Sequence, residues 1–161
     1  MDRIMNSKPP TRTFAELDPE GAAATRLIAL SLQISMFFAA ASILTYLLDD
    51  RLDFPFAIIS AALFGVGILL LSLGFWNGIQ RSRVDDVTLT GLLAIDKTHV
   101  PASARNKLWG AIVIQVVVSV LFASLRPFTQ QAFGLLVPTL GLGIATLWGS
   151  RFAAFHERGE R

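Results

Sequence analysis

The sequence contains no cysteine, so disulfide bonds, thiolate metal sites and cysteine nucleophiles are excluded. Charged residues are also scarce, at 16% of the 161 residues. The two histidines, His99 and His156, stand apart in the sequence and have no cysteine beside them, so a metal site is not predicted. No nucleophile is paired with a base. We therefore expect no catalytic residue, no cofactor and no metal, and we interpret the chain as a protein that is not an enzyme.

Four long apolar runs are the main feature that the sequence does contain, and none of them includes an Asp, Glu, Lys, Arg or His. They cover residues 27–48, 54–79, 108–125 and 132–150. Each run matches the ~20 residues that a helix needs to cross the hydrocarbon core of a bilayer. The pattern predicts an all-α polytopic membrane protein, with four transmembrane helices as two antiparallel hairpins. Because such an interior lacks ionisable groups, coupling to protons through a buried carboxylate is not expected.

Two parts are expected along the chain. Residues 1–17 are polar and are predicted to form a mobile cytoplasmic tail. Residues 18–161 are predicted to form the four-helix transmembrane domain, with a cytoplasmic loop at 80–107. A long polar segment precedes the first apolar run, so this run is interpreted as a span and not as a cleavable signal peptide.

Prolines mark the expected helix boundaries. Asp18-Pro19-Glu20 predicts the start of the first helix, and Pro101 the start of the third. Arg126-Pro127 is expected to end the third helix, because a residue before proline is pushed out of the helical region. Pro138 lies inside the fourth run and predicts a kink, since proline removes one backbone hydrogen bond.

Basic residues fall almost entirely on one side of the predicted bundle. With four crossings, twelve of the fourteen Lys and Arg residues lie on the side of both termini and the middle loop. The twelve are Arg3, Lys8, Arg12, Arg26, Arg81, Arg83, Lys97, Arg105, Lys107, Arg151, Arg158 and Arg161. Cytoplasmic loops carry the excess of Lys and Arg, so we expect both termini in the cytoplasm. The formal charge is only +2 and the bases form no single patch, so no nucleic-acid partner is expected.

Small residues recur within the spans at a spacing of about four, which creates smooth faces for close helix packing. The expected helix-packing residues are Ala61, Gly65, Gly74, Gly78, Gly141, Ala145 and Gly149. Two interpretations stay open. These faces pack the helices of one bundle together, or they form the interface with a second copy or another membrane protein.

Three amide side chains, Gln33, Asn77 and Gln115, are the most polar groups within the spans. They are expected either to form interhelical hydrogen bonds or to line a polar cavity. Arg126 is the base at the outer end of the third run and is interpreted as an outer-surface anchor. It would pair with an acid of the turn at 49–53 or hold a lipid phosphate. Asp53 is expected to cap the second helix.

The middle loop is the one region with room for recognition. Its apolar residues have a loosely helical spacing, at Val84, Val87, Leu92 and Ile95. Residues 84–96 are therefore expected to form either a short helix on the inner membrane surface or a solvated connection. In the first case Arg81 and Arg83 would contact anionic headgroups.

The two predicted hairpins share a weak pattern. Gly65-Val66-Gly67-Ile68 in the first corresponds to Gly141-Leu142-Gly143-Ile144 in the second, each followed by a Trp and an Arg. Internal duplication and convergence on small residues both remain open explanations.

The second half of the chain resembles a family of small four-span membrane proteins from actinobacteria. The resemblance rests on Ser103-Ala104-Arg105, on the segment from Ala123 to Thr129, on Val137-Pro138 and on Leu147-Trp148-Gly149-Ser150-Arg151. It covers roughly the last sixty residues. The resemblance implies a bacterial inner-membrane location and adds no activity or site residue.

These observations lead to two expected functions. The first is a non-enzymatic accessory or assembly partner in a membrane complex, with the lipid bilayer and a membrane-protein partner or a second copy as its contacts. The alternative is a small homo-oligomeric carrier or channel for a small solute or lipid, not coupled to protons through a buried carboxylate.

Overall fold

The computed structural model describes residues 20–48, 52–127 and 129–155, and every regular element in that part of the chain is a helix. The long helices are α1 (Glu20–Leu47), α2 (Asp53–Arg81), α4 (Ala102–Leu125) and α5 (Pro138–Phe152). A short α3 (Leu89–Leu92) and a 3₁₀ helix, η3 (Gln130–Leu136), complete the order. Four helical segments are long and apolar enough to cross a membrane, with η3 and α5 together forming the fourth. The predicted all-α polytopic membrane fold is confirmed.

Helix boundaries follow the prolines. α1 begins at Glu20 and α4 begins at Ala102, directly after Pro19 and Pro101, while α4 ends at Leu125 before Arg126-Pro127. The expected tail at 1–17 and the cap at Asp18 lie outside the described residues.

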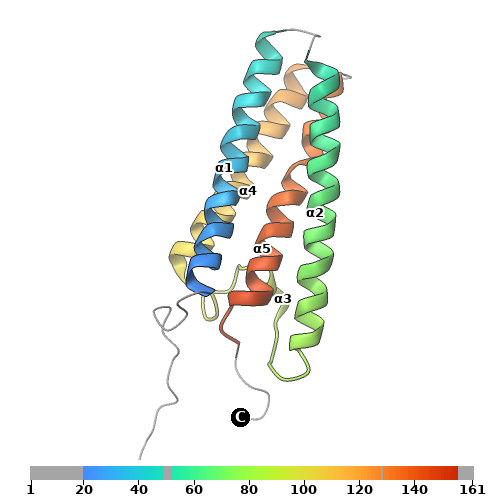
Figure 1. Cartoon of the computed structure of the whole chain (residues 1–161). Helices are drawn as coiled ribbons and strands as arrows, with labels where there is room; N and C mark the ends of the chain where they lie inside the picture. The colour runs from blue at the N-terminus through green and yellow to red at the C-terminus, as the bar shows by residue number, and fades with distance from the viewer. Residues whose placement is uncertain (1–19, 49–51, 128, 156–161) are drawn as a thin grey trace, which may run out of the picture.

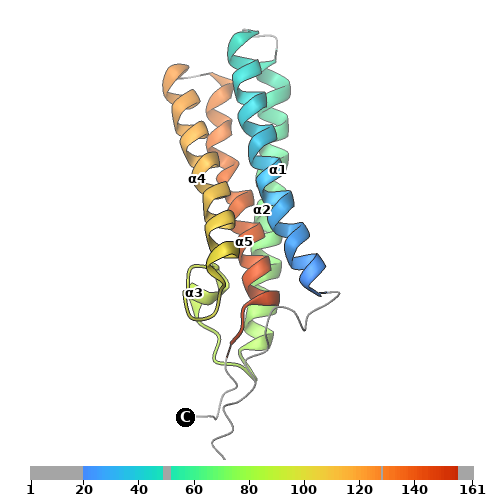
Figure 2. The ribbon, with the colours of Figure 1, turned by 90° about the vertical axis from the view of Figure 1, so that its left-hand side faces the viewer.

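The four spans form a bundle in which the most extensive contact is between α2 and the fourth span, which run in the same direction (Figures 1 and 2). We call the end where α1 stops and α2 begins the upper end, and the end with the α2–α4 connection the lower end. α1 and α4 both run upward and pack together, while α2, η3 and α5 run downward and pack together. α1 makes few contacts with α2, although the two are consecutive. Of the two predicted antiparallel hairpins, the second is a packed pair, because α4 also lies against η3 and α5, whereas α1 and α2 of the first make little contact with each other.

α5 is the central helix of the bundle. It lies between α1, α2 and α4, and every residue from Gly143 to Ser150 is buried. The other spans instead expose broad apolar faces, including Phe37 of α1, Leu69 of α2 and Val117 of α4. In a membrane these faces contact lipid tails, which are as apolar as the side chains themselves. Leaving the faces uncovered by protein therefore has little free-energy cost.

Glycines allow α2 and α5 to approach each other very closely. A Cβ built on Gly67 would lie 2.6 Å from the backbone nitrogen of Leu140, and one on Gly143 would lie 2.5 Å from the carbonyl oxygen of Gly67. A Cβ on Gly74 would lie 2.8 Å from the backbone of Thr146. No side chain larger than hydrogen fits at these points, so the two backbones touch.

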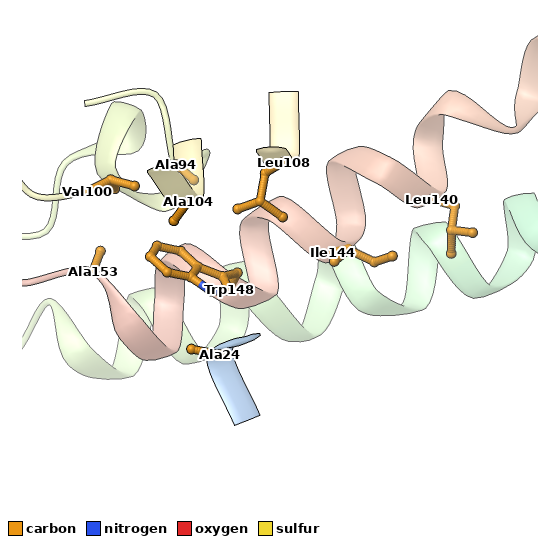
Figure 3. Packing of buried hydrophobic residues seen from close by; sticks show 9 residues of the cluster. All are labelled: Ala24, Ala94, Val100, Ala104, Leu108, Leu140, Ile144, Trp148 and Ala153. Atoms are coloured by element: carbon orange, nitrogen blue, oxygen red, sulfur yellow. The ribbon is translucent and has the colours of Figure 1, made fainter. Parts of the chain in front are cut away.

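Trp148 fills the lower half of the core. Its side chain is fully buried, and Figure 3 shows it among Ala24 of α1, Ala104 of α4 and Ala94 and Val100 of the connecting segment. Alanines around the indole let these three segments of the chain approach one large side chain. Toward the upper end of the bundle, to the right in Figure 3, Leu108, Ile144 and Leu140 continue the core from Trp148.

Gly143→Ala is expected to destabilise the bundle, because the added methyl group would overlap the Gly67 carbonyl and force α2 and α5 apart. Overpacking of this kind costs about 1–3 kcal/mol. The measurement is thermal or denaturant unfolding in detergent micelles. Gly65→Ala is the matched control, since nothing lies within 4 Å of a Cβ at that position of α2. Equal stability of the two variants would contradict the proposed close contact.

Candidate functional site

A buried polar cluster links α1, α4 and α5 at the middle of the bundle. Gln115 of α4 and Ser35 of α1 are both fully buried, and the Gln115 Nε2 donates to Ser35 Oγ at 2.9 Å. The Ser35 hydroxyl in turn donates to the carbonyl of Ser31 at 2.8 Å and lies 3.2 Å from that of Ala111. This chain of hydrogen bonds ties the parallel pair α1–α4 together at a depth where water is absent.

Gly141 of α5 provides the space for this cluster. A Cβ at position 141 would lie 2.7 Å from the Gln115 Oε1 and 2.8 Å from Ile112. The Oε1 itself is buried without a hydrogen-bond partner, as is the hydroxyl of Ser31. Both oxygen atoms can therefore accept a further hydrogen bond in the interior of the bundle.

The other two expected amides are elsewhere. Gln33 lies on the exposed face of α1, and Asn77 is half-buried near the lower end of α2. The three amides therefore do not converge on one lining surface, and Gln115 alone occupies the interior.

A second buried contact, between α4 and η3, lies beside the break in the fourth span at Pro138. The fourth span does not bend there as one α-helix: it is a 3₁₀ helix to Leu136, and Pro138 opens α5. Since Pro138 has no N–H, the carbonyl of Gly134 accepts from Val137 N at 3.1 Å and from the Ser119 hydroxyl at 2.9 Å. The same hydroxyl lies 2.5 Å from the carbonyl of Gln115, so it has an acceptor within hydrogen-bond distance on both α4 and η3.

Arg81 holds the lower ends of α2 and α5 together. Its Nη1 donates to the carbonyl of Ser150 at 3.1 Å, its Nε pairs with Asp85 at 2.7 Å, and its guanidinium lies 5.0 Å from the ring centre of Phe155. A cation at the carbonyl end of a helix also offsets the helix dipole. The expectation that Arg81 contacts lipid headgroups applied if residues 84–96 formed a surface helix; the structure instead places its guanidinium against the last carbonyls of α5.

Arg126 makes the corresponding contact at the upper end. Its Nη2 donates to the carbonyl of Tyr46 in the last turn of α1 at 3.3 Å, and the guanidinium lies 5.2 Å from the Tyr46 ring centre. Tyr46 packs edge-on against Phe122 of α4. The expected acids Asp49 and Asp50 lie outside the described residues, and Asp53 is engaged elsewhere.

Asp53 is buried where α2 and η3 both begin. It was expected to cap α2, but Leu52 occupies the cap position and Asp53 is the first helical residue. Its Oδ1 lies 3.4 Å from the Nε2 of Gln131, which is also buried. A carboxylate at two adjacent helix N-termini is favourable because both dipoles are positive there.

The connecting segment is folded back onto the bundle. Only residues 89–92 form a helix, so the expected helix over 84–96 is shorter than predicted. Leu92 turns inward against Gly78 and Gly149, whereas Val84 and Ile95 are exposed. Val84, Val87, Leu92 and Ile95 therefore do not lie on one apolar face of a helix.

A compact group of polar residues follows α3. The Asp96 carboxylate accepts from the hydroxyl and the backbone N–H of Thr98 and lies 2.8 Å from His99 Nδ1. These hydrogen bonds hold the pKa of the Asp96 carboxyl well below its usual value. The carbonyl of His99 also accepts from Ala154 at 3.0 Å, which fixes the segment after α5. Residues 20–48, 52–127 and 129–155 contain no group of three metal-ligating side chains.

The small residues divide into two sets. Gly74, Gly78, Gly141, Ala145 and Gly149 all lie in the interior of the bundle. Ala61 and Gly65 face outward from α2, and within one chain they pack against no other helix. Gly67 and Gly143, where the backbones of α2 and α5 meet, are not identified by the four-residue spacing. A spacing of seven along α2 would have found Gly67, since Asp53, Ser60, Gly67, Gly74 and Arg81 form one row facing the fourth span.

Comparisons with known proteins add no relative. No family model matches the chain, and neither the curated proteins nor the solved structures contain a significant match.

Arg81→Gln is expected to loosen the lower end of α5, because the last carbonyls of that helix lose a charged donor. Such a contact contributes about 0.3–2 kcal/mol, which corresponds to roughly 2- to 30-fold faster hydrogen exchange at residues 149–155. Hydrogen–deuterium exchange with mass spectrometry measures this effect. Arg83→Gln is the control, since Arg83 is exposed two residues further on. Identical exchange in the two variants would show that Arg81 does not hold α5.

Proposed function

We propose that this membrane protein is a non-enzymatic accessory or assembly partner, which receives a transmembrane helix on the outward face of α2. The observation that carries the proposal is the exposed pair Ala61 and Gly65, one helical turn apart, with nothing within 4 Å of a Cβ on Gly65. In lipid, helices associate where small residues let two backbones approach closely. The same chemistry joins α2 to α5 on the opposite side of the helix, where Gly67 and Gly74 lie against the α5 backbone.

The location belongs to the same proposal. The distribution of Lys and Arg favours a cytoplasmic lower end, with both termini on that side. The resemblance to small actinobacterial four-span proteins supports a bacterial inner membrane. Neither argument assigns a substrate or a cofactor.

Photo-cross-linking in native membranes tests this function. Because the chain has no native cysteine, Ala61→Cys can carry a single benzophenone group. We expect one discrete adduct, with a second copy or with another membrane protein. Adding Gly65→Leu should lower its yield about tenfold, the effect of ~1.4 kcal/mol on an association constant.

Gly110→Cys on α4 is the control, since Gly110 also has nothing within 4 Å of a Cβ. It is expected to give no discrete adduct. If both positions label only lipid, and purification in mild detergent gives a solitary monomer, the assembly role is rejected.

A small carrier or channel is the second candidate function. The observation in its favour is the interior polar cluster, where the Ser31 hydroxyl and the Gln115 Oε1 are buried without a hydrogen-bond partner. Such atoms would suit a neutral polar solute that exchanges hydrogen bonds along the bundle. The described spans offer no carboxylate at this depth, so transport would be passive.

Stopped-flow light scattering of proteoliposomes tests the carrier, with water and glycerol as the probes. A carrier predicts that Gln115→Leu abolishes protein-dependent flux while Gln33→Leu, on the exposed face of α1, leaves it unchanged. Wild-type flux equal to that of empty liposomes, or flux unaffected by Gln115→Leu, would reject a path through this cluster.

A further inference from the structure

The segment between α2 and α4 exposes large apolar side chains that neither the bundle nor the proposed assembly face uses. Val84, Leu89 and Ile95 are 64%, 59% and 41% exposed. Leu92 and Ala94 from the same segment are buried in the bundle. Apolar groups that remain outside the core of an otherwise well-packed connection indicate a surface that meets another apolar phase.

Contacts with three helices determine how deep this segment lies. Leu92 packs against Gly78 of α2 and Gly149 of α5, and Trp109 Nε1 of α4 donates to the carbonyl of Leu93 at 3.2 Å. Two of the tryptophans lie at or next to these contacts near the lower ends of their helices: Trp76 of α2, which is exposed two residues before Gly78, and the half-buried Trp109 of α4. Tryptophan is enriched where a helix passes the headgroups of a bilayer. The segment is therefore held beside the headgroups, where Leu89 and Ile95 can reach the lipid.

Residues 82–101 contain two bases and three acids, but the exposed charges near these apolar side chains are mainly positive. Arg83 and Lys97 are exposed within the segment, and Lys107 is exposed in the second turn of α4. Two of the nearby acids already have partners, because Asp85 pairs with Arg81 and Asp96 binds Thr98 and His99. Asp86 is the one exposed acid among residues 82–101. A basic rim around apolar side chains is complementary to acidic headgroups above acyl chains.

We propose that residues 82–101 form a docking surface for acidic phospholipids at the lower end of the bundle. Val84, Leu89 and Ile95 insert among the headgroups, and Arg83, Lys97 and Lys107 bind the lipid phosphates. The surface is continuous with the lipid-facing side of α2, where Trp76 and Ile79 are exposed. This surface does not include the outward face of α2 at Ala61 and Gly65. The lipid-docking proposal can therefore be tested independently of the assembly role.

Spin labelling tests the surface in the full chain. Single cysteines are placed at Leu89 and Ile95, and at the exposed polar controls Thr90 and Thr98 of the same segment. The nitroxide-labelled proteins are reconstituted in phosphatidylcholine with or without phosphatidylglycerol. Collision rates are then measured with oxygen, which concentrates in lipid, and with a water-soluble nickel chelate.

We expect oxygen to dominate at 89 and 95 and the nickel chelate at 90 and 98. Phosphatidylglycerol should increase the oxygen-to-nickel ratio at 89 and 95 several-fold, and the combined variant Arg83→Gln, Lys97→Gln and Lys107→Gln should remove that increase. Equal nickel access at all four positions in both lipids would overturn the proposal and indicate a water-facing surface for a soluble partner. An increase that survives in the triple variant would overturn the assignment of the bases. Circular dichroism and gel filtration establish that each labelled protein is folded.

Discussion

The close approach of α2 and α5 is the contact on which the rest of the bundle depends. Apolar side chains gain little by leaving lipid for a helix surface, so two membrane helices need another source of attraction. Gly67 and Gly143 supply it, because their backbones touch where any side chain would prevent contact. Dispersion then acts along the stretch where the two helices lie side by side. α5 can be buried at the centre only because α2 accepts it so closely.

The parallel pairing creates an electrostatic problem that charged residues offset. Two helices that run in the same direction bring like ends of their dipoles together. Arg126 lies at the carbonyl ends of α1 and α4, Arg81 lies at those of α2 and α5, and Asp53 lies where α2 and η3 begin. Each of these charges therefore serves two helices at once. This explains why ionisable side chains are placed at the ends of the spans while the long apolar stretches contain none.

The number of spans and the boundaries of the first three could be predicted from the sequence, because runs without charge and prolines near their ends are local signals. The division of the fourth span into a 3₁₀ helix and α5 could not. The partners of individual side chains could not. Gln33 and Gln115 have the same chemistry in the sequence, yet one lies outside and the other at the centre, since helix rotation is decided by the packing of all the spans. Asp53 resembled a local cap because its partner, Gln131, is distant in the chain. Arg81 resembled a lipid anchor for the same reason, as its partner is the last turn of α5.

The hydroxyl of Ser119 has a consequence for how the protein is made. The fourth span has the lowest mean hydropathy of the four, is interrupted at Pro138 and carries a Gly134 carbonyl that is fully satisfied only beside α4. A segment of this kind partitions poorly into lipid alone, because an incompletely bonded carbonyl is costly there. The first three spans thus provide the environment that the last one requires. The C-terminal helix therefore gains more from the bundle than the other spans do, and without it the glycine face of α2 lacks its partner.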